Sequence, residues 1–567
     1  MLLKSLCCVK GNSIESDYKS IIMEPQLPPP VNNLVTPLHT DLYQLTMAYG
    51  YWKTNRHNED SVFELFFRKS PFKGTYTIFC GIDEVLKFVS NFRFTAEDIA
   101  YLKTIPSMAH CEPEFFEYLS NLDCSEVKIE SIPMGSVVFP RVPLVIVSGP
   151  IVIAQLLETT LLNLINFPSL VATNASRMVI AARGQKNDIK VYGKIPKCVE
   201  FGLRRAQGPD GAFSASKYCM VGGFDSIANV QAGKLLNLPV GGTHAHSFVM
   251  SFNALDDLKN SPNVVKKGNE MIDLVKLSLK YREELDYMDT NEGELAAFLA
   301  YAIAFPNTFL CLIDTYDTLE SGIKNFIAVA LALIDCGYKP IGVRLDSGDL
   351  GALSLDCHEV FHGIADKYNL DIFRQMDVVA SSDINEALLL EMKEKGHGIT
   401  MFGIGTNLVT CQAQPALGGV FKLTELNGIP RIKLSADIAK VLLPGRKRAF
   451  RFFDEKYRPF MDYLMEAKDE VPMAGKEVCV FDPFTKNKGR RFVPTLVKEI
   501  LQTVWDGKRG VTVAQPTLME ARETCIKAIQ SLDPDMVKAK DPKKYDVCVS
   551  NTLYTDLHAL WESSKHE

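Results

Sequence analysis

The middle and later parts of the chain repeat one local pattern, in which a short apolar run is followed by polar residues and then by a helical stretch. The polar residues of these repeats occupy 242–247, 314–317, 344–349, 381–383 and 403–407. The later repeats are spaced by roughly 25 to 40 residues, which is the length of a βα unit. Strands that alternate with helices in this way build a parallel sheet, so the sequence predicts an α/β fold.

The polar residues that follow each apolar run are the candidate functional residues. In parallel βα architectures the loops at the carboxyl ends of the strands converge on one face. The most informative loop is Gly242-Thr243-His244-Ala245-His246-Ser247, which places an imidazole and two hydroxyls where an apolar strand through Leu238 and Val240 should end. We therefore expect His246 to face a site rather than a core, and we interpret His244 as a structural or peripheral histidine.

The length of 567 residues exceeds one ordinary hydrophobic core and predicts two or three domains. Residues 1–35 contain three consecutive prolines and lack periodicity, which is typical of a mobile tail. After this tail we expect a mixed α/β domain at 36–150, an irregular α/β barrel with the active site at 151–425, and a C-terminal domain at 426–567.

Some local elements can be predicted within these divisions. The sequence predicts a helix over Tyr43–Trp52 and a strand over Val62–Phe67. Asp383 and Glu386 have the spacing of a capping box at the start of a later helix. The charged insertion at 253–285 interrupts the βα spacing, and we interpret it as a helical surface excursion.

Composition narrows the class of partner and the compartment. A net charge of −6 gives no global reason to bind nucleic acid or an acidic membrane. The 14 cysteines include no Cys-x-x-Cys pair, which argues against a zinc site or a disulfide framework and favours the cytosol. The most apolar segment, 295–313, is broken by Pro306, and the opening apolar run is too short for a secretory signal.

A group of charged residues would suit a polyanionic substrate with a divalent cation. Arginine binds phosphates and carboxylates through paired hydrogen bonds, whereas carboxylates hold magnesium and sugar hydroxyls. The basic members are Arg204, Arg205, His246, Arg344, Lys422 and Lys433, and the acidic members are Asp314, Asp346 and Asp383. Gly403-Ile404-Gly405-Thr406 adds a candidate phosphate cradle, because glycines let backbone N–H groups approach an anion. Singly, each feature also fits ordinary turn chemistry or an ion pair.

Five ordered motifs resemble those of nicotinate phosphoribosyltransferases. They are Thr40-Asp41-Leu42-Tyr43-Gln44, the segment from Glu200 to Gly208 with Arg204 and Arg205, Gly242 to Phe248, Arg344 to Asp349, and Phe402 to Asn407. The resemblance covers nearly everything from residue 38 onward. It implies an irregular (β/α) barrel with a flanking α+β domain built from both chain ends, so that 426–567 would pack with the N-terminal domain.

The resemblance implies an enzyme that joins nicotinate to 5-phosphoribosyl 1-diphosphate, giving nicotinate mononucleotide and pyrophosphate in the Preiss-Handler salvage route to NAD. This reaction would be coupled to ATP hydrolysis through a transient phosphohistidine, as in a ligase-type enzyme, and His246 matches that histidine. The resemblance also implies Mg²⁺ (or Mn²⁺) as cofactor and a cytosolic homodimer with shared active sites, without nucleic acid or membrane partners.

Individual residues match the motifs of the family as follows. The catalytic candidates are His246, Asp314 and Arg344, and the nicotinate-binding candidates are Tyr43, Thr243 and Arg344. Candidates for binding phosphoribosyl diphosphate are Thr406, Gly403, Gly405, Arg204, Arg68 and Asp346. By this resemblance Arg344 would pair with the pyridine carboxylate, and Tyr43 would stack on the pyridine of the neighbouring subunit. The chain departs from the family at His244, where an apolar residue is common.

Four alternatives remain open at this point. Within the superfamily the chain could be a nicotinamide-specific transferase, or a quinolinate transferase, although chains of the latter kind are much shorter. A catalytically silent protein that keeps the fold is a third alternative, and it would have been favoured by loss of His246, Asp314 or Arg344. A metal-dependent aldolase on a (β/α)₈ barrel would use a similar face but would not explain the motif around His246.

Overall fold

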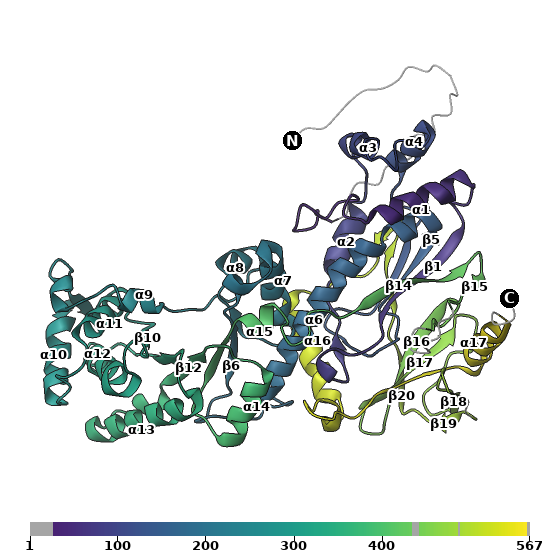
Figure 1. Ribbon diagram of the computed structural model, residues 1–567. Helices are drawn as coiled ribbons and strands as arrows, with labels where there is room; N and C mark the ends of the chain where they lie inside the picture. Colours follow the sequence, from purple (N-terminus) through teal and green to yellow (C-terminus); the bar gives the residue numbers. More distant parts are fainter. Residues whose placement is uncertain (1–26, 434–440, 486–487, 564–567) are drawn as a thin grey trace, which may run out of the picture.

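The computed structural model describes residues 27–433, 441–485 and 488–563, so most of the tail predicted at 1–35 lies outside the described residues. The described chain forms three larger sheets, of seven, six and four strands. Figure 1 shows the six-stranded sheet with its helices on one side of the long helix α6 (Glu158–Arg183) and the other two sheets on the opposite side. The molecule therefore has two halves that meet along α6.

The six-stranded sheet is parallel throughout and has the order β10-β11-β12-β13-β6-β7. Its strands are β6 (Lys197–Glu200), β7 (Ser226–Ile227), β10 (Leu310–Leu312), β11 (Gly342–Leu345), β12 (Asp377–Ser381) and β13 (Met401–Ile404). Helices α12 (Ile323–Asp335), α13 (Leu350–Tyr368) and α14 (Glu386–Lys395) connect consecutive strands from β10 to β13. The mixed α/β fold with a parallel sheet is confirmed. Closure of this sheet into a barrel stays a prediction.

The expected strand through Leu238 and Val240 is reduced in the structure to one parallel bridge between Val240 and Ile227 of β7. After this bridge the chain runs as a loop through 241–245 to the short helix α9 (His246–Val249). The loop thus begins beside β7, at one end of the strand order, and its later residues reach β10 at the opposite end, where Leu312 N donates to His244 Nε2.

The seven-stranded sheet combines distant parts of the chain in the order β15-β14-β1-β5-β3-β21-β22. Its strands are β1 (Asp60–Phe67), β3 (Lys128–Ser131), β5 (Val145–Pro150), β14 (Gly419–Leu426), β15 (Ile429–Pro430), β21 (Gln502–Asp506) and β22 (Gly510–Val511). All its pairings are antiparallel. Strands from both ends of the chain therefore share one sheet, while the predicted domain boundaries stay predictions.

The four-stranded sheet has the order β20-β16-β17-β23. Its strands are β16 (Lys447–Phe453), β17 (Pro459–Glu466), β20 (Leu496–Glu499) and β23 (Asp546–Val549). It is joined to the seven-stranded sheet by an ion pair of 2.9 Å between Lys447 Nζ at the start of β16 and Glu64 Oε1 in β1. Both side chains are almost fully buried.

Helices α5 (Ile151–Leu156) and α6 form one apolar segment at the centre of the molecule (Figure 1). Ile151–Arg183 is the one described segment long and apolar enough to cross a membrane, although 61% of its most apolar window is buried inside the fold. It differs from 295–313, the segment considered from sequence, which contains helix α11 (Glu292–Ala304) and strand β10.

Several local predictions are confirmed and two are wrong. The expected helix and strand near the start appear as α1 (Leu42–Lys53) and β1. The capping box of α14 is wrong, because the side chain of Asn385, and not that of Asp383, accepts from Leu388 N. The helical interpretation of 253–285 is wrong at 264–273, where a hairpin of β8 (Val264–Lys267) and β9 (Glu270–Asp273) lies between the 3-10 helix η3 (Leu255–Leu258) and helix α10 (Leu274–Glu284).

Candidate active site

A cavity of about 350 Å³ opens at the carboxyl ends of the strands in the parallel sheet. Its walls come from the loop after β6, the loop of 242–246, the end of β10 and the end of β11. The lining residues are Phe201, Leu203, Arg204, Ala228, Gly242, Thr243, His244, Ala245, His246, Leu312, Arg344 and Asp346. The polar residues that follow separate apolar runs in the sequence thus meet in one place.

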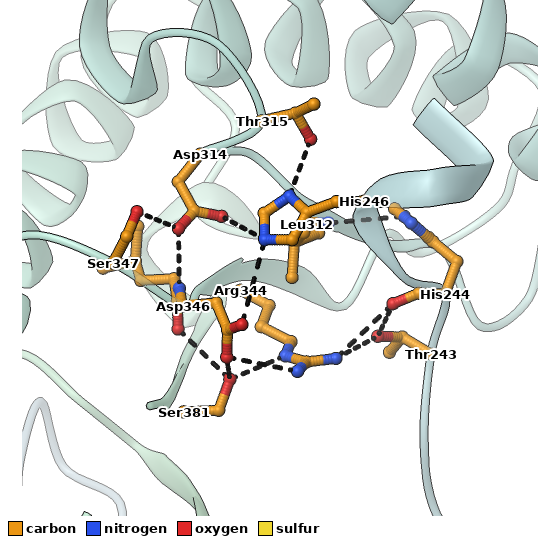
Figure 2. Close-up of polar contacts among 11 residues, drawn as sticks. Thr243, His244, His246, Leu312, Asp314, Thr315, Arg344, Asp346, Ser347 and Ser381 are labelled. Atoms are coloured by element: carbon orange, nitrogen blue, oxygen red, sulfur yellow. Dashed lines mark hydrogen bonds and ion pairs between the residues drawn. The ribbon is translucent and has the colours of Figure 1, made fainter. Parts of the chain in front are cut away.

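His246 begins helix α9 and faces two carboxylates (Figure 2). Its Nδ1 lies 3.1 Å from Thr315 Oγ1, and its Nε2 lies 3.9 Å from Asp314 Oδ1 and 3.8 Å from Asp346 Oδ2. The ring is 37% exposed, so Nε2 is accessible to a ligand. When Nδ1 carries the proton and donates a hydrogen bond to the threonine hydroxyl, Nε2 is unprotonated. Its lone pair is then free for nucleophilic attack.

Asp314 follows β10, and only 2% of its side chain is exposed. Its Oδ2 accepts hydrogen bonds from Asp346 N at 2.9 Å and from Ser347 Oγ. Its Oδ1 is buried without a hydrogen-bond partner among the described residues and faces His246. Because an unsatisfied buried oxygen is costly, Oδ1 is suited to a hydroxyl donor or a cation supplied by a ligand.

Arg344 points from β11 into the cavity and is held from three sides (Figure 2). Its Nε donates to Ser381 Oγ at the end of β12 at 2.9 Å, and its Nη2 lies 3.4 Å from Asp346 Oδ1. Its Nη1 donates weakly to Thr243 Oγ1 at 3.5 Å and to the backbone oxygen of His244 at 3.4 Å. The long Nη contacts leave donor capacity for a carboxylate, which arginine binds bidentately.

An aromatic side chain covers Arg344 on the side toward β6. The Arg344 guanidinium carbon lies 5.2 Å from the centre of the Phe201 ring, within cation–π range. Burial lowers the pKa of Arg344, and the neighbouring Asp346 carboxylate opposes that shift. Arginine nevertheless stays charged in proteins, so the cavity holds a fixed cation beside an aromatic ring.

The glycines at the end of β13 pack against Phe201. A Cβ on Gly403 would lie 2.4 Å from the Phe201 ring, and one on Gly405 would lie 3.3 Å from the Phe201 backbone oxygen. The structure therefore explains the need for glycine at 403 by ring packing. Thr406 begins the short helix α15 (Thr406–Val409) and is not among the residues that line the cavity. A phosphate cradle at this turn stays a prediction.

The structure brings together six of the residues singled out from sequence, namely Arg204, Thr243, His246, Asp314, Arg344 and Asp346. Gly403 and Gly405 lie next to them behind Phe201. Tyr43 and Arg68 lie elsewhere: Tyr43 is 44% exposed on α1, which Figure 1 places in the half away from β10, and Arg68 directly follows β1. The structure contains one chain, so the contribution of Tyr43 to a neighbouring subunit stays a prediction.

Sequence reasoning assigned no role to three side chains that orient the site. Thr315 contacts the His246 ring, Ser347 donates to Asp314, and Ser381 accepts from Arg344. Each stands in a polar segment at a strand end, and this position is the sequence feature that could have identified it as a site residue. His244 is also part of the site, because its half-buried ring accepts from Leu312 N in β10 and its carbonyl faces Arg344.

The described residues contain no group of three or more His, Cys, Asp or Glu side chains arranged to hold a metal. Asp314 and Asp346 nevertheless present carboxylate oxygens within 4 Å of one ring nitrogen, so they lie close together. Mg²⁺ commonly binds one or two protein carboxylates and completes its shell with water and substrate phosphates. The pair of carboxylates and the buried orphan oxygen of Asp314 fit such a cation.

Three family models match the chain in sequence order. The nicotinate phosphoribosyltransferase N-terminal domain matches 38–166, the nicotinate phosphoribosyltransferase family model matches 196–449, and the C-terminal domain matches 446–557. Together they span most of the described chain.

Full-length relatives and one solved structure agree with these models. The chain is 47% identical over 542 residues to nicotinate phosphoribosyltransferase from Dictyostelium discoideum, covering 94% of this chain and 90% of that one. It is 40% identical over 532 residues to the Homo sapiens protein of the same name, covering 92% and 96%. The crystal structure of human nicotinic acid phosphoribosyltransferase superposes with a TM-score of 0.81 at 37% identity, covering 92% of this chain and 99% of that chain. A Pyrococcus furiosus nicotinate-nucleotide pyrophosphorylase, at 16% identity and a TM-score of 0.55, shares the fold, covering 88% and 97%.

Proposed function

Because this chain belongs to the nicotinate phosphoribosyltransferase family, we propose that its cavity joins nicotinate to 5-phosphoribosyl 1-diphosphate, with ATP hydrolysis coupled through His246. The products are nicotinate mononucleotide and pyrophosphate, which places the reaction in the Preiss-Handler salvage route to NAD. One observation carries this proposal. A fixed arginine, two carboxylates and an accessible histidine nitrogen share one cavity at the carboxyl ends of the strands.

Nicotinate is a planar ring with a carboxylate, and the cavity offers a partner for each part. Arg344 pairs with the carboxylate, and Thr243 adds a hydroxyl beside the same guanidinium. Phe201, which already lies over the guanidinium, packs against the ring. The pyridine nitrogen carries a free lone pair, so no side chain has to remove a proton before it attacks the anomeric carbon.

The phosphoribosyl donor lies toward Asp314, Asp346 and Arg204. Breaking the bond to pyrophosphate builds positive charge on the ribose and negative charge on the leaving group. Asp314 Oδ1, which lacks a partner among the described residues, accepts a ribose hydroxyl or helps hold Mg²⁺ with Asp346. When bound, Mg²⁺ (or Mn²⁺) neutralises the pyrophosphate charge. We propose that Gly403, Gly405, Thr406 and Arg68 also contact the donor.

The coupling to ATP is a transfer of one phosphoryl group to His246 and then to water. The Nε2 lone pair attacks the γ-phosphorus of ATP, the bond to the bridging oxygen breaks, and ADP leaves. Positive charge that develops on the ring is stabilised by Asp314 and Asp346 within 4 Å. Water later attacks the same phosphorus, releases inorganic phosphate and restores the imidazole. The added negative charge reorganises the donor site between these two steps.

Three further assignments accompany this function. The loop of 241–245 leads from Val240, which bridges β7, to His244, which accepts a hydrogen bond from Leu312 N in β10. This connection supports an irregular barrel, flanked by an α+β domain from both chain ends. The half-exposed Tyr43 supports a homodimer in which each subunit supplies this ring to the other's site. We propose that the enzyme acts in the cytosol.

Product formation by the purified protein tests the proposal. Phosphoribosyl diphosphate and magnesium are supplied with nicotinate, nicotinamide or quinolinate, each with and without ATP. Of the three pyridine substrates, we expect only nicotinate to give a mononucleotide, and we expect ATP to raise the rate of its formation. A preference for nicotinamide or quinolinate would move the chain to another branch of the superfamily. Inactivity with all three would favour a silent protein that keeps the fold.

Replacing His246 by Ala tests the coupling separately. The variant should lose the stimulation by ATP and the radiolabel transferred from [γ-³²P]ATP, while slow basal transfer remains, because Arg344, Asp314 and Asp346 are unchanged. His110 is a suitable control, since it is exposed and lies outside the cavity. A His246→Ala variant with full ATP stimulation would disprove the coupling through this residue.

A further inference from the structure

We infer that His244 is a positioning residue: its imidazole takes the place of a missing strand beside β10, and this contact sets the carbonyl and hydroxyl that hold Arg344 in the nicotinate cavity. The inference rests on the proposed function, because it assigns Arg344 to the substrate carboxylate.

Strand β10 is an edge strand of the parallel sheet, and its backbone at Leu312 has no neighbouring strand on one side. Strand β10 pairs with β11 through Ile313 N, which donates to Arg344 O at 3.1 Å. Successive backbone amides of a strand point in opposite directions, so Leu312 N faces away from β11. Within the described chain no strand pairs with β10 on that side. Leu312 is nearly fully buried, so water does not readily replace the missing partner.

The His244 ring supplies the missing acceptor. Leu312 N donates to His244 Nε2 at 3.3 Å (Figure 2). A buried N–H without a partner is destabilising, because it loses its hydrogen bond to water on folding. An apolar side chain at 244 would leave this amide unpaired, whereas a neutral imidazole with its proton on Nδ1 accepts from it. That Nδ1 is itself buried without a hydrogen-bond partner among the described residues, which offsets part of the gain.

The ring is held in that position by an aromatic cluster. Its centre lies 4.8 Å from the ring centre of Tyr301, 5.5 Å from that of Phe248 and 6.5 Å from that of Phe298. Burial, with added effects of Arg344 and His246, lowers the pKa of His244 to about 4. The imidazole is therefore neutral at physiological pH, as acceptance at Nε2 requires.

The same residue touches Arg344 through its backbone. Arg344 Nη1 donates to His244 O at 3.4 Å and to Thr243 Oγ1 at 3.5 Å. These groups lie on a loop whose tip has no regular secondary structure, and Gly242 in it is exposed. The bond from the His244 ring to β10 fixes this loop close to the guanidinium. The side chain thus acts on nicotinate binding through Arg344.

The two histidines of the loop differ in whether Nε2 is accessible to a phosphoryl donor. His244 Nε2 is occupied by the Leu312 amide, whereas His246 Nε2 faces the cavity and is accessible. A phosphoryl acceptor needs an accessible lone pair. His244 therefore does not compete with His246 for the phosphoryl group.

Two substitutions test the inference. His244→Leu removes the acceptor and keeps an apolar side chain, whereas His244→Gln places an amide oxygen near the position of Nε2. We expect His244→Leu to raise the KM for nicotinate about tenfold, with kcat and the KM for phosphoribosyl diphosphate within twofold of wild type. His244→Gln should restore most of the affinity. In an Arg344→Lys background, His244→Leu should have no further effect, because the group through which it acts is gone.

Amide hydrogen exchange gives a readout that does not depend on activity. The peptide that contains Leu312 should exchange at least tenfold faster in His244→Leu than in wild type, and near the wild-type rate in His244→Gln. Unchanged exchange and unchanged KM in His244→Leu would overturn the inference, as would equal defects in both variants. If the wild-type protein does not use nicotinate, the proposed function fails, and the exchange experiment still decides whether His244 anchors the loop.

Discussion

Arg344 illustrates how neighbouring side chains prepare one cation for a ligand. Its Nε is used by Ser381, while its Nη groups make only long contacts with Thr243, His244 and Asp346. One end of the guanidinium is therefore fixed and the other is available. This arrangement depends on the planar guanidinium, whose N–H groups point in fixed directions. The compact ammonium group of a lysine could not reproduce it.

Arg344→Lys should therefore impair nicotinate binding although the charge is kept. Loss of charge-assisted hydrogen bonds of about 1.5–3 kcal/mol corresponds to a KM for nicotinate raised roughly 10- to 100-fold. Steady-state kinetics with each substrate varied measures this effect. Arg374→Lys at the surface, where Arg374 pairs with exposed Asp366, is the matched control. A KM within twofold of wild type in Arg344→Lys would contradict the role of Arg344.

Glu294 lies on α11 and is fully buried. Its Oε2 accepts from Ser321 Oγ at 2.6 Å and from Asn325 Nδ2 at 3.0 Å, and Oε1 has no partner among the described residues. Burial, with added repulsion from Asp314 and Asp317, raises the pKa of Glu294 from its ordinary value near 4.5 to about 7. The protonated form is thus favoured in the folded protein.

The pH dependence follows from the sign of this shift. Between pH 4.5 and 7 the folded state holds a proton that the unfolded state has released, so stability falls as the pH rises through this range. Glu294→Gln, which keeps the shape and cannot ionise, should be more stable than wild type at pH 8 by about 1–3 kcal/mol and similar to it at pH 5. Urea unfolding at both pH values measures the difference. Glu391→Gln on the surface of α14 should show no such pH dependence.

At the residue scale, the sequence predicts which polar side chains follow strands, and the structure brings Thr243, His246, Asp314 and Arg344 together. It does not predict the contacts of His244 and Glu294. The task of His244 depends on an unpaired amide in a strand about 70 residues away in the chain. Glu294 stands within an apolar helical stretch, and its partners come from two later elements, Ser321 from η4 (Thr318–Gly322) and Asn325 from α12.

At the scale of single elements, the π-helix η4 (Thr318–Gly322) sets the loop that carries Asp314. Gly322 has an ordinary helical φ of −57°, so it is not needed for backbone freedom. It is needed for space, because a Cβ there would lie 1.9 Å from the Ile313 backbone oxygen. Glycine thus allows η4 to lie directly against the end of β10.

Gly322→Ala should push η4 away from Ile313 and disturb Asp314 next to it. Such overpacking against backbone lowers the free energy of unfolding by about 1–3 kcal/mol or more. Thermal unfolding together with transferase activity measures both effects. Gly363→Ala is the matched control, because its Cβ would meet nothing within 4 Å on the exposed face of α13. That change should raise stability by about 0.5–1 kcal/mol; equal behaviour of the two variants would contradict the steric argument.

Element boundaries can be predicted from the sequence where hydrophobic periodicity is strong. They are harder to predict where two nearby residues could each cap the same helix. The helix at 43–52 and the strand at 62–67 follow from apolar spacing. Asp383 and Asn385 are both good capping residues, and Asp383 instead adopts a positive φ of 44°. The hairpin in 264–273 is short, charged and largely exposed, so it lacks the alternating pattern of a half-buried strand.

At the scale of the whole molecule, a buried ion pair connects the seven-stranded and the four-stranded sheets. Lys447 pairs with Glu64 and also donates to the backbone oxygens of Leu443, Pro444 and Gly445. Lys447→Met should lower the free energy of unfolding by about 3–5 kcal/mol, because it leaves a buried carboxylate and three carbonyls without a partner. Chemical unfolding measures this loss.

The same pair allows a test of coupling between the sheets. Adding Glu64→Gln to Lys447→Met should lower stability by less than the sum of the two single changes, because the uncompensated charge is removed. Lys527→Met, at an exposed pair with Glu523, should leave stability within about 0.5 kcal/mol of wild type. Additive losses would show that the Lys447–Glu64 contact is not energetically coupled.

The sequence predicts the parallel sheet because each βα repeat is local, whereas the seven-stranded sheet joins residues that no local pattern relates. Strand β1 pairs with β14, and β3 pairs with β21. Their alternating residues show that they are strands but do not identify their partners. The resemblance to a known family implied a domain from both chain ends, and composition alone did not.

The pairing of β3 with β21 has a consequence for protein synthesis. Strand β3 ends at Ser131, and its partner begins at Gln502, about 370 residues later. At ribosomal rates of about 5–20 residues per second, the interval between the two is on the order of 20–70 s. During this time the nascent chain exposes an unpaired strand edge, which is prone to associate with other chains. We therefore expect the seven-stranded sheet, which stays incomplete for this interval, to need protection by a chaperone during translation.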